Sequence, residues 1–315
     1  MHISKLKNNV VGISMGDPSG IGPEIIAKAL SKPQIRNLAS FKIIGDLGIY
    51  KRYSKKEYKN CSFIDLKAIQ PKCFKIGKIN EHSGKAAFAY LEKSVELLKS
   101  GEINSIVTAP VCKEAISLSH PSFCGHTEFF AAAFNVKKYG MMFLGPNLRL
   151  LLATRHMPIN KIPAVLTSEL IYETIDLADK TLKNTFRIKK PSIAILGLNP
   201  HAGEGGLLGK EEIEIIIPAM NKAIKHKIAV SGPFSADTFF IDRQVKYDMI
   251  IAIYHDQGLI PIKTLYFTQL VNFTIGLPII RTSPAHGTAF DIAGKGTADP
   301  ASMIESIKLA THLSQ

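Results

Sequence analysis

The sequence contains no tryptophan and only four cysteines among its 315 residues, and the cysteines are scattered without a CxxC pair. Four scattered cysteines do not form a tight disulfide framework, so we expect their thiols to be reduced. No apolar run reaches the length that spans a membrane, and the basic N-terminal segment MHISKLKNN has no signal-peptide core. We therefore expect a cytoplasmic protein with no membrane partner.

Two familiar phosphate-binding glycine motifs are also missing. The segment GDPSGIGPE follows the first apolar run but does not match GxGxxG, which disfavours a Rossmann-type cofactor site there. The segment NPHAGEGGLLGKEE contains Gly-Lys, yet Glu204 replaces the first glycine of a Walker A motif and Glu211 replaces its Ser or Thr. We expect these glycines to shape a turn that presents His201.

Positive charge is abundant, with 39 Lys and Arg against 26 Asp and Glu and a net charge of +13. The lysines spread over the whole chain, and the densest region, residues 42–78, carries no other motif. This distribution favours a solvated basic surface. A nucleic-acid-binding module remains the remote alternative; it requires clustered cations with interleaved aromatic side chains.

Short apolar runs alternate with helical patterns, which predicts an α/β fold with mostly parallel sheets. The length exceeds one usual core and predicts two domains. One clear helix is expected from about Ser83 to Lys99, capped by Ser83 and followed by Gly101. The predicted strands are Val10–Ser14, Phe41–Ile44, Ile106–Thr108, Leu148–Ala153, Ile193–Leu198, Met249–Ile253 and Val271–Ile275.

Three histidines follow apolar runs at equivalent places. LLLATRH ends at His156, IAILGLNPH at His201 and MIIAIYH at His255. Because ligands bind beyond the carboxyl ends of strands in open α/β sheets, we expect the three side chains to converge. Three imidazoles with an open fourth position suit a catalytic divalent metal.

A second polar set has the character of an anion site. His126 and Thr127 open an apparent helix, where free backbone N–H groups attract anions. Lys263, Asn272 and Arg281 are expected near the ends of later strands. Together they supply donors for a phosphorylated, carboxylated substrate.

The segment SPAHGTAFDIAGKGTADP, residues 283–300, is rich in glycine and alanine and reads as a loop whose backbone lies against a flat polar ligand. It resembles the nucleotide-binding loop of the isocitrate/isopropylmalate dehydrogenase superfamily. That resemblance places His286 and Asp291 beside the adenosine half of NAD or NADP. Gly287 and Gly294 are expected to let the backbone approach the nucleotide.

Motifs over most of the chain resemble the 4-hydroxythreonine-4-phosphate dehydrogenase family: GDPSGIGPE, TAPVCKEA, GHTEFFA, TRHMPI, LNPHAGEGG, GPFSADTFF, YHDQGLIPIK and NFTIGLPIIRTSPAHGTAFDIAGKGTADP. The resemblance implies two α/β/α domains of the isocitrate/isopropylmalate dehydrogenase type, with the active site in the interdomain cleft. Residues 1–110 and 262–315 are expected to bind the cofactor, and residues 111–261 the metal, the substrate and a second subunit.

The resemblance also implies the residue roles. The metal ligands are His156, His201 and His255, drawn from both subunits of a homodimer and holding zinc, magnesium or cobalt. The substrate residues are His126, Thr127, Lys263, Asn272 and Arg281. The general base stays open between Lys263 and Asp256.

The activity implied is NAD(P)-dependent oxidation of 4-phosphooxy-L-threonine to 2-amino-3-oxo-4-(phosphooxy)butanoate, in pyridoxine 5′-phosphate biosynthesis. This β-keto acid loses CO₂ to give 3-amino-2-oxopropyl phosphate. A sister dehydrogenase acting on 4-phospho-D-threonate or 4-phospho-D-erythronate is the alternative, since its motifs are nearly the same. The sequence does not decide between NAD and NADP.

Overall fold

The computed structural model describes residues 9–242 and 244–315, which form two compact units. Unit 1 comprises residues 9–135 and 277–315, and unit 2 comprises residues 136–276. The chain leaves unit 1 after Asn135 and returns after Gly276, whereas the sequence places these crossings near residues 110 and 262. Phe130 explains the first difference, because it is buried in the core of unit 1. The basic segment 1–8 lies outside the described residues.

Unit 1 is built on a parallel sheet in the order β3-β2-β1-β4-β11. Its central strand reads VVGIS and is buried almost throughout, as expected for a strand covered on both faces. The strands are β1 (Val10–Ser14), β2 (Ser40–Gly45), β3 (Cys61–Asp65), β4 (Ser105–Thr108) and β11 (Ile280–Pro284).

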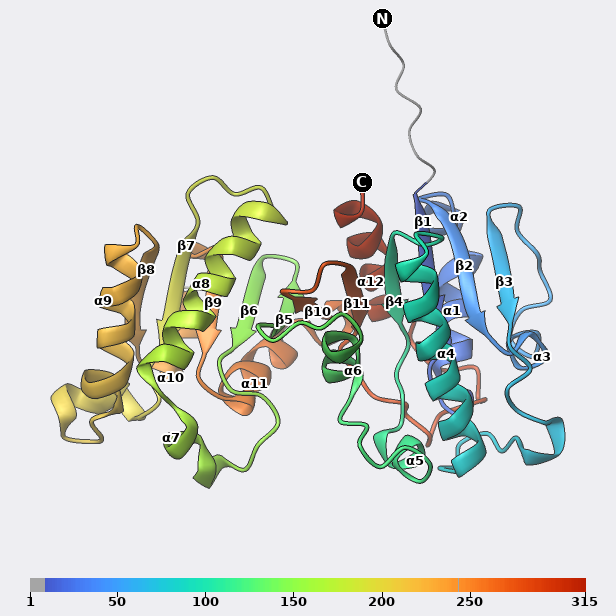
Figure 1. The fold of residues 1–315 in the computed structure, drawn as a ribbon, viewed down its shortest axis with the longest axis horizontal. Helices are drawn as coiled ribbons and strands as arrows, with labels where there is room; N and C mark the ends of the chain where they lie inside the picture. Colours follow the sequence, from blue (N-terminus) through green and yellow to red (C-terminus); the bar gives the residue numbers. More distant parts are fainter. Residues whose placement is uncertain (1–8, 243) are drawn as a thin grey trace, which may run out of the picture. The chain divides into compact units, whose positions relative to one another are not determined.

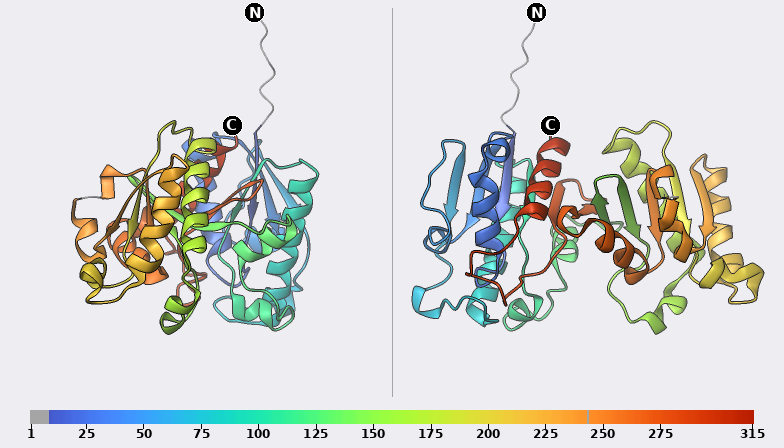
Figure 2. Two further views of the ribbon diagram at one scale, coloured as in Figure 1. Left: turned by 60° about the vertical axis from the view of Figure 1, so that its left-hand side comes forward. Right: turned by 180° about the vertical axis from the view of Figure 1, so that it is seen from behind.

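Helices cover both faces of the unit 1 sheet: α4 lies on one face in Figure 1, and α1 and α12 lie on the other in the rear view of Figure 2. The helices are α1 (Gly22–Ser31), α2 (Pro33–Arg36), α3 (Leu47–Tyr50), α4 (Glu81–Lys99), α5 (Lys113–Ser117), α6 (His126–Ala133) and α12 (Ala301–Leu313). A short 3₁₀ turn spans Pro71–Cys73.

The start of α4 corrects one detail of the predicted helix. Asn80 is the N-cap, and its side chain accepts a hydrogen bond from the Ser83 backbone N–H at 2.9 Å. Ser83 is buried one turn later and contacts the Ser19 hydroxyl at 2.6 Å. The cap therefore moves three residues toward the N-terminus, because asparagine is at least as good a cap as serine.

Unit 2 has a mixed sheet in the order β10-β5-β6-β9-β7-β8. The pairs β10–β5 and β5–β6 are antiparallel, and the remaining pairs are parallel. The strands are β5 (Gly140–Gly145), β6 (Leu148–Leu152), β7 (Ser192–Leu196), β8 (Ala229–Phe234), β9 (Met249–Ala252) and β10 (Val271–Ile275). The sheet therefore departs from all-parallel geometry at one edge only.

The helices of unit 2 follow the same layering, with α8 and α9 packed together on one face and α11 against β6 and β9. They are α7 (Ile162–Val165), α8 (Ser168–Asn184), α9 (Ile217–Lys225), α10 (Ala236–Asp242) and α11 (His255–Tyr266). A π-helical turn, Glu212–Ile216, precedes α9. Short 3₁₀ turns span Ile159–Lys161, Pro200–Gly206, Gln244–Lys246 and Phe267–Gln269.

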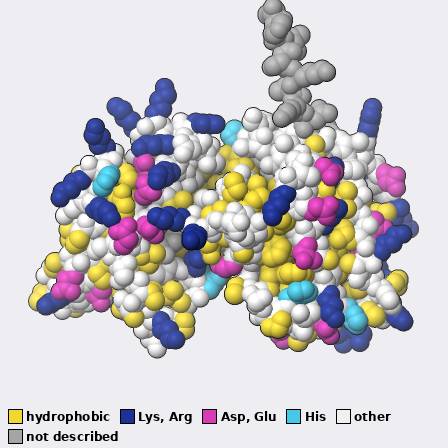
Figure 3. Space-filling view, in the orientation of Figure 1, with side chains coloured by type: hydrophobic (Ala, Val, Ile, Leu, Met, Phe, Trp, Pro, Cys, Tyr) yellow, Lys and Arg dark blue, Asp and Glu magenta, His cyan; other side chains and the backbone are white. Residues whose placement is uncertain are grey.

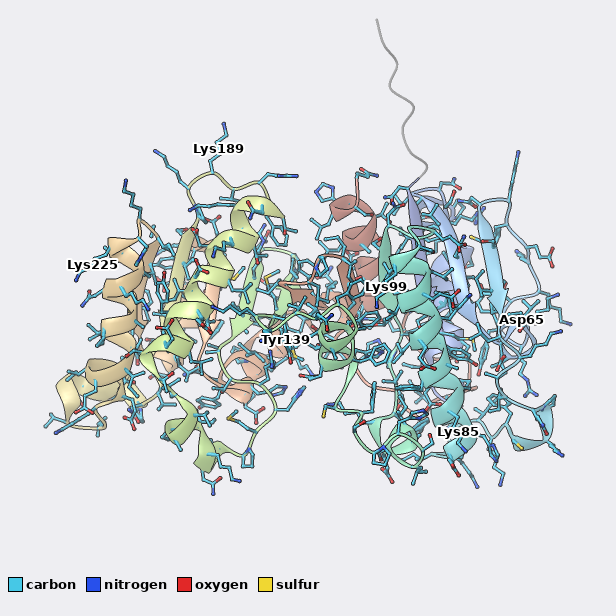
Figure 4. All side chains as sticks on the ribbon, in the orientation of Figure 1. Asp65, Lys85, Lys99, Tyr139, Lys189 and Lys225 are labelled. Carbon is cyan, nitrogen blue, oxygen red and sulfur yellow. The ribbon has the colours of Figure 1, made fainter. Side chains whose placement is uncertain are left out.

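All seven predicted strands are present, and the α/β prediction is confirmed. Among the described residues, no helix is both long and apolar enough to cross a membrane. Lys and Arg side chains are distributed over the visible surface of both units in Figure 3. In Figure 4, Lys189 and Lys225 point away from the body of unit 2.

Candidate active site

Arg281 is the most deeply buried cation in the described chain, with 1% of its surface exposed. It is the second residue of β11, and it donates two hydrogen bonds to the Thr108 hydroxyl, from Nη2 at 2.6 Å and from Nε at 3.1 Å. The parallel β4–β11 pairing pairs Arg281 with Ile106, near Thr108. Burial lowers the pKa of Arg281 to about 9, and the Glu128 carboxylate opposes this shift.

His126 belongs to the same positive cluster. It is the first residue of α6, as the sequence predicts, and its Nε2 is buried without a hydrogen-bond partner among the described residues. Burial lowers its pKa well below the usual value, and the charges of Arg281 and Lys113 lower it further. His126 is therefore neutral at physiological pH, with a ring nitrogen able to meet a ligand.

We call Thr108, His126, Thr127 and Arg281 the Arg281 cluster. Its members converge from β4, β11 and the first turn of α6, and Thr127 is also buried. Burial is the first cause of the lowered pKa of both Arg281 and His126, so an anion bound beside them would stabilise both charged forms. The cluster thus has the chemistry of a site for a phosphate or carboxylate.

Asp17 is a buried carboxylate for which the sequence analysis assigned no role. It follows β1 within GDPSG, is 0% exposed, and accepts a hydrogen bond from the Ser19 N–H at 2.9 Å through Oδ1. Its Oδ2 has no partner among the described residues. Burial raises its pKa to about 6, although the Ser19 and Cys112 backbone hydrogen bonds oppose the shift. The signal in the sequence was an acidic residue inside a small, apolar segment.

The pKa of Asp17 predicts a pH-dependent effect of Asp17→Asn. Because the folded pKa lies above the ordinary 3.8, the folded chain holds a proton that the unfolded chain loses between about pH 4 and pH 6. Ionisation of Asp17 in the folded chain therefore lowers the free energy of unfolding of the wild type by about 3 kcal/mol as the pH rises through this window. The unfolding free energy of Asp17→Asn, relative to wild type, should increase by a comparable amount from pH 4 to pH 7. Urea unfolding at both values measures it, and a difference independent of pH contradicts the assignment.

In unit 2 the strand register brings two of the three histidines together. Leu152 of β6 pairs with Ala252 of β9, and the Thr154 N–H donates to the Ile253 carbonyl at 3.0 Å. The two segments that follow β6 and β9 therefore leave the sheet side by side, and the ring centroids of His156 and His255 lie 5.3 Å apart. Two imidazoles so placed fit neighbouring ligand positions on one metal ion.

His255 is oriented by its neighbours. Its Nδ1 is 2.7 Å from Oδ1 of Asp256, which leaves Nε2 for a metal. The Gln257 side chain accepts from the Ile253 N–H at 2.7 Å and donates to the Gly197 carbonyl at 2.6 Å. Gln257, which the sequence analysis did not select, thus ties the start of α11 to the ends of β9 and β7.

His201 lies on an unusual turn after β7. Residues 201–206 all have positive φ angles, a left-handed stretch that glycines at 203, 205 and 206 make accessible. His201 itself is exposed and has φ 51°. The pKa of Asp237 is lowered first by the hydrogen bond from Ser235, and more weakly by the Thr238 backbone and by the nearby His201.

Two glutamates clamp this turn. The Asn199 amide donates to Glu211 at 2.7 Å and to Glu212 at 2.9 Å, and the Asn199 N–H donates to Glu212 at 2.8 Å. Glu212 is 1% exposed, and a Cβ added at Gly203 would lie 2.6 Å from its Oε2. The glycines therefore shape the turn, as predicted. The hydrogen bonds from Asn199 to Glu211 and Glu212 were not predicted from the sequence.

The described part of the chain contains no group of three His, Cys, Asp or Glu residues close enough to hold a metal. His156 and His255 supply two donors, and His201 is not grouped with them. A third protein ligand must come from elsewhere if this pair binds a catalytic metal, because such sites usually have three.

The remaining predicted substrate residues of unit 2 take different positions. Asn272 is the second residue of β10, and its Oδ1 is buried without a hydrogen-bond partner among the described residues. Lys263 lies in the last turn of α11 and not at a strand end. Asp256 faces His255, so its carboxylate is engaged in orienting that ring.

The glycine-rich segment forms a loop between β11 and α12 and is held by α1. Glu24 Oε1 accepts from the Ala298 N–H at 3.0 Å, and Lys28 Nζ donates to the Gly296 and Ala298 carbonyls at 2.8 and 2.7 Å. The Ile21 N–H donates to the Thr288 carbonyl at 3.0 Å. The GDPSGIGPE motif therefore supports this loop, a role that its sequence did not reveal.

Within the loop, His286 is half-buried and its Nδ1 lies 3.0 Å from the Gly287 carbonyl, while Asp291 is exposed. A Cβ added at Gly287 would meet nothing within 4 Å. At Gly294, where φ is +76°, it would lie 2.8 Å from Ile76. Gly294 thus permits close packing inside unit 1, whereas Gly287 leaves open space beside the backbone.

The chain has the fold of an isocitrate dehydrogenase. The isocitrate dehydrogenase of Methylococcus capsulatus shares this fold with a TM-score of 0.53 at 13% identity, covering 96% of this chain and 85% of that one. The model of the family described as pyridoxal phosphate biosynthetic protein PdxA matches residues 22–310. The chain belongs to this family.

Similar proteins carry two different names. The 4-hydroxythreonine-4-phosphate dehydrogenase of Desulforapulum autotrophicum is 42% identical, covering 96% of this chain and 94% of its own. The putative D-threonate 4-phosphate dehydrogenase of Oceanobacillus iheyensis is 41% identical, covering 98% of both chains. The crystal structure of 4-hydroxythreonine-4-phosphate dehydrogenase from Klebsiella pneumoniae has a TM-score of 0.85 at 35% identity, covering 98% of this chain and all of that one.

Proposed function

We propose that the chain catalyses NAD(P)-dependent oxidation of 4-phosphooxy-L-threonine to 2-amino-3-oxo-4-(phosphooxy)butanoate. The hydride passes to the nicotinamide and the hydroxyl proton to a base, and the resulting β-keto acid loses CO₂ to give 3-amino-2-oxopropyl phosphate. The observation that carries this proposal is family membership together with the Arg281 cluster, whose buried cation and helix N-terminus suit a phosphorylated acid.

The proposal gives each group of residues a separate role. The Arg281 cluster binds an anionic group of the substrate, and Asn272 offers a buried amide oxygen to one of its donors. His156 and His255 hold a divalent metal, for which zinc, magnesium and cobalt are the candidates. A metal bound there would supply Lewis-acid polarisation of the oxygen on the carbon that is oxidised.

The proton acceptor is proposed by elimination between two residues. The Asp256 carboxylate lies 2.7 Å from His255 Nδ1 and serves to orient that imidazole. Lys263 is half-buried on the same helix and hydrogen-bonds no carboxylate in the described structure. We therefore assign removal of the hydroxyl proton to Lys263, which would accept it as the neutral amine, since an ammonium group has no acceptor.

We further propose a homodimer in which His201 of a second copy completes the metal site. Unit 2 exposes several large apolar side chains near the turn that carries His201, and exposed patches of this kind mark protein interfaces. Their exposed fractions are 84% for Leu207, 47% for Ile213, 38% for Ile217, 76% for Ile241 and 63% for Val245. Sedimentation of the purified chain tests the oligomeric state.

The second candidate substrate is 4-phospho-D-threonate or 4-phospho-D-erythronate, because a relative at 41% identity is named for D-threonate 4-phosphate. These acids carry a hydroxyl where 4-phosphooxy-L-threonine carries its amino group. NADH or NADPH formation with each substrate and each divalent metal decides between them. The ratio of kcat/KM values identifies the preferred acid, and no turnover with any of them rejects the proposed activity.

A glycine pair tests the proposed cofactor loop. Gly287→Ala has room for the new methyl group, so we expect a stability change within about 0.5 kcal/mol but weaker NAD⁺ binding. Gly294→Ala meets Ile76 and a positive φ, so we expect a loss of about 1–3 kcal/mol. Urea unfolding and calorimetric titration with NAD⁺ measure both. Wild-type NAD⁺ affinity in Gly287→Ala contradicts the assignment of the loop.

A further inference from the structure

A cavity of about 430 Å³ lies at the outer edge of unit 1, within the size range of small-molecule sites. The edge strand β3, helix α3 and the segment 54–59 that joins them line it, and Figure 1 shows β3 as the outermost strand of unit 1. This segment belongs to the Lys-rich region to which neither the sequence motifs nor the proposed activity assigns a role. No residue of the Arg281 cluster or of the glycine-rich loop lines the cavity.

One side of the cavity, which we call the floor, is apolar and aromatic. It comprises Ile43, Leu47, Tyr50 and Phe63. Ile43 is 3% exposed and Tyr50 is 6% exposed, so both are held in the packed body of unit 1. The ring centroids of Tyr50 and Phe63 lie 5.5 Å apart at an interplanar angle of 46°. Because aromatic rings favour tilted and offset contacts with one another, this floor suits the face or edge of a further ring.

The opposite side, which we call the rim, has an excess of positive charge. Four lysines and one glutamate line the cavity, and the glutamate, Glu57, lies 3.7 Å from Lys51. The other three lysines, Lys55, Lys56 and Lys59, are exposed and make no ion pair with any described residue. Three neighbouring ammonium groups repel one another, and an anion bound among them would relieve this repulsion. The rim therefore selects an anion.

Tyr50 and Cys61 also line the cavity, and both are uncharged at physiological pH. Burial raises the pKa of Tyr50, and Cys61 and Tyr58 raise it further. Burial raises the pKa of Cys61 to about 11, although Arg36 opposes this shift. The Tyr50 hydroxyl makes no hydrogen bond within the described structure, so it is able to donate to a ligand. Neither group adds a negative charge that would repel an anion.

We propose that this cavity binds a small aromatic phosphate, with the ring against Tyr50 and Phe63 and the phosphate among Lys55, Lys56 and Lys59. A phosphate monoester carries a charge of about −1.5 to −2 at pH 7 and three acceptor oxygens, which matches three unpaired ammonium groups better than a carboxylate does. The proposed dehydrogenase activity is not needed for this assignment, because the cavity shares no residue with the proposed active site.

Calorimetric titration of the full chain with phenyl phosphate, inorganic phosphate and phenol tests the two halves of the ligand separately. Phenyl phosphate should bind at least about tenfold more tightly than either of the others, because it alone combines apolar contact with charge. The Arg281 cluster is also proposed to bind an anion, so each titration is repeated with Arg281→Met. Phenyl phosphate should still bind to the cavity of that variant.

Two variants and a matched control locate the binding. Lys55→Ala combined with Lys59→Ala should weaken phenyl phosphate binding about tenfold or more, through the loss of charge-assisted hydrogen bonds. Tyr50→Phe keeps the ring and should weaken binding about threefold to tenfold, with an unfolding midpoint close to that of wild type. Lys189→Ala combined with Lys225→Ala is the control, because it removes the same charge from exposed lysines of unit 2 (Figure 4). This control should bind phenyl phosphate as wild type does.

Three results would overturn the site. The first is no binding of phenyl phosphate, or equal affinity in wild type and in both cavity variants. The second is binding that Arg281→Met abolishes and the double lysine variant keeps, which assigns the ligand to the Arg281 cluster. The third is inorganic phosphate binding as tightly as phenyl phosphate, which removes the role of the floor. Turnover of 4-phosphooxy-L-threonine with NAD⁺ is measured on the same wild-type preparation, so the two proposals fail independently.

Discussion

His201→Ala is expected to reduce turnover by more than about a hundredfold, because even the residues that only orient metal ligands change affinity or activity by ten- to a hundredfold. Metal content should fall in parallel, while the fold persists, since His201 is exposed on the surface of unit 2. Metal analysis and steady-state rates measure the two effects. His226→Ala is a suitable control, because His226 is also exposed in unit 2 and ends α9.

Mixing two inactive variants tests whether His201 acts across a dimer. In a shared site, His201→Ala supplies an intact His156 and His255, and His156→Ala supplies an intact His201. After subunit exchange, roughly a quarter of wild-type activity should return, since half of random dimers are mixed and each has one complete site of two. If exchange is demonstrated by a mass tag and no activity returns, His201 does not complete the site from a second copy.

The fold was largely predictable because its central strands are apolar. The run MIIA of β9 is buried at every position, and VVGIS of β1 nearly so. Four strands were missed, β3, β5, β8 and β11; β5 reads GMMFLG and carries the apolar signal, whereas β8 and β11 lack it. β11 reads IRTSP and buries an arginine, a threonine and a serine, and β8 is an edge strand with exposed positions.

The site was predictable where a residue type and a strand end coincide. His156 and His255 lie close together because the parallel strands β6 and β9 end at the same edge of the sheet. The position of each histidine after an apolar run is enough to predict this. The turn of His201 was not predictable in detail, since left-handed backbone and a π-helical turn have no simple sequence period. The partners of buried groups, such as Glu24 and Ala298, lie far apart in sequence and need the folded chain.

Arg281→Met should raise the KM for the phosphorylated substrate about tenfold to a hundredfold, because each charge-assisted hydrogen bond contributes about 1.5–3 kcal/mol. The KM for NAD⁺ should change far less. Methionine keeps much of the buried volume, so the loss reports on charge and donors. The KM of Arg281→Lys for the phosphorylated substrate should lie between those of wild type and Arg281→Met. Lysine keeps the charge but loses the planar guanidinium group that contacts Thr108.

Arg149→Ala is the matched control for this result. Arg149 is also partly buried, stacks 4.8 Å over Phe186 and donates to the Asp248 carbonyl at 3.2 Å, but it belongs to no proposed site. It should alter stability without separating the two KM values. Equal increases in both KM values for Arg281→Met, or an effect no larger than that of Arg149→Ala, place the substrate phosphate or carboxylate elsewhere. A selective loss assigns the anion to the Arg281 cluster, because burial lowers the pKa of Arg281 and a bound anion would stabilise its charged form.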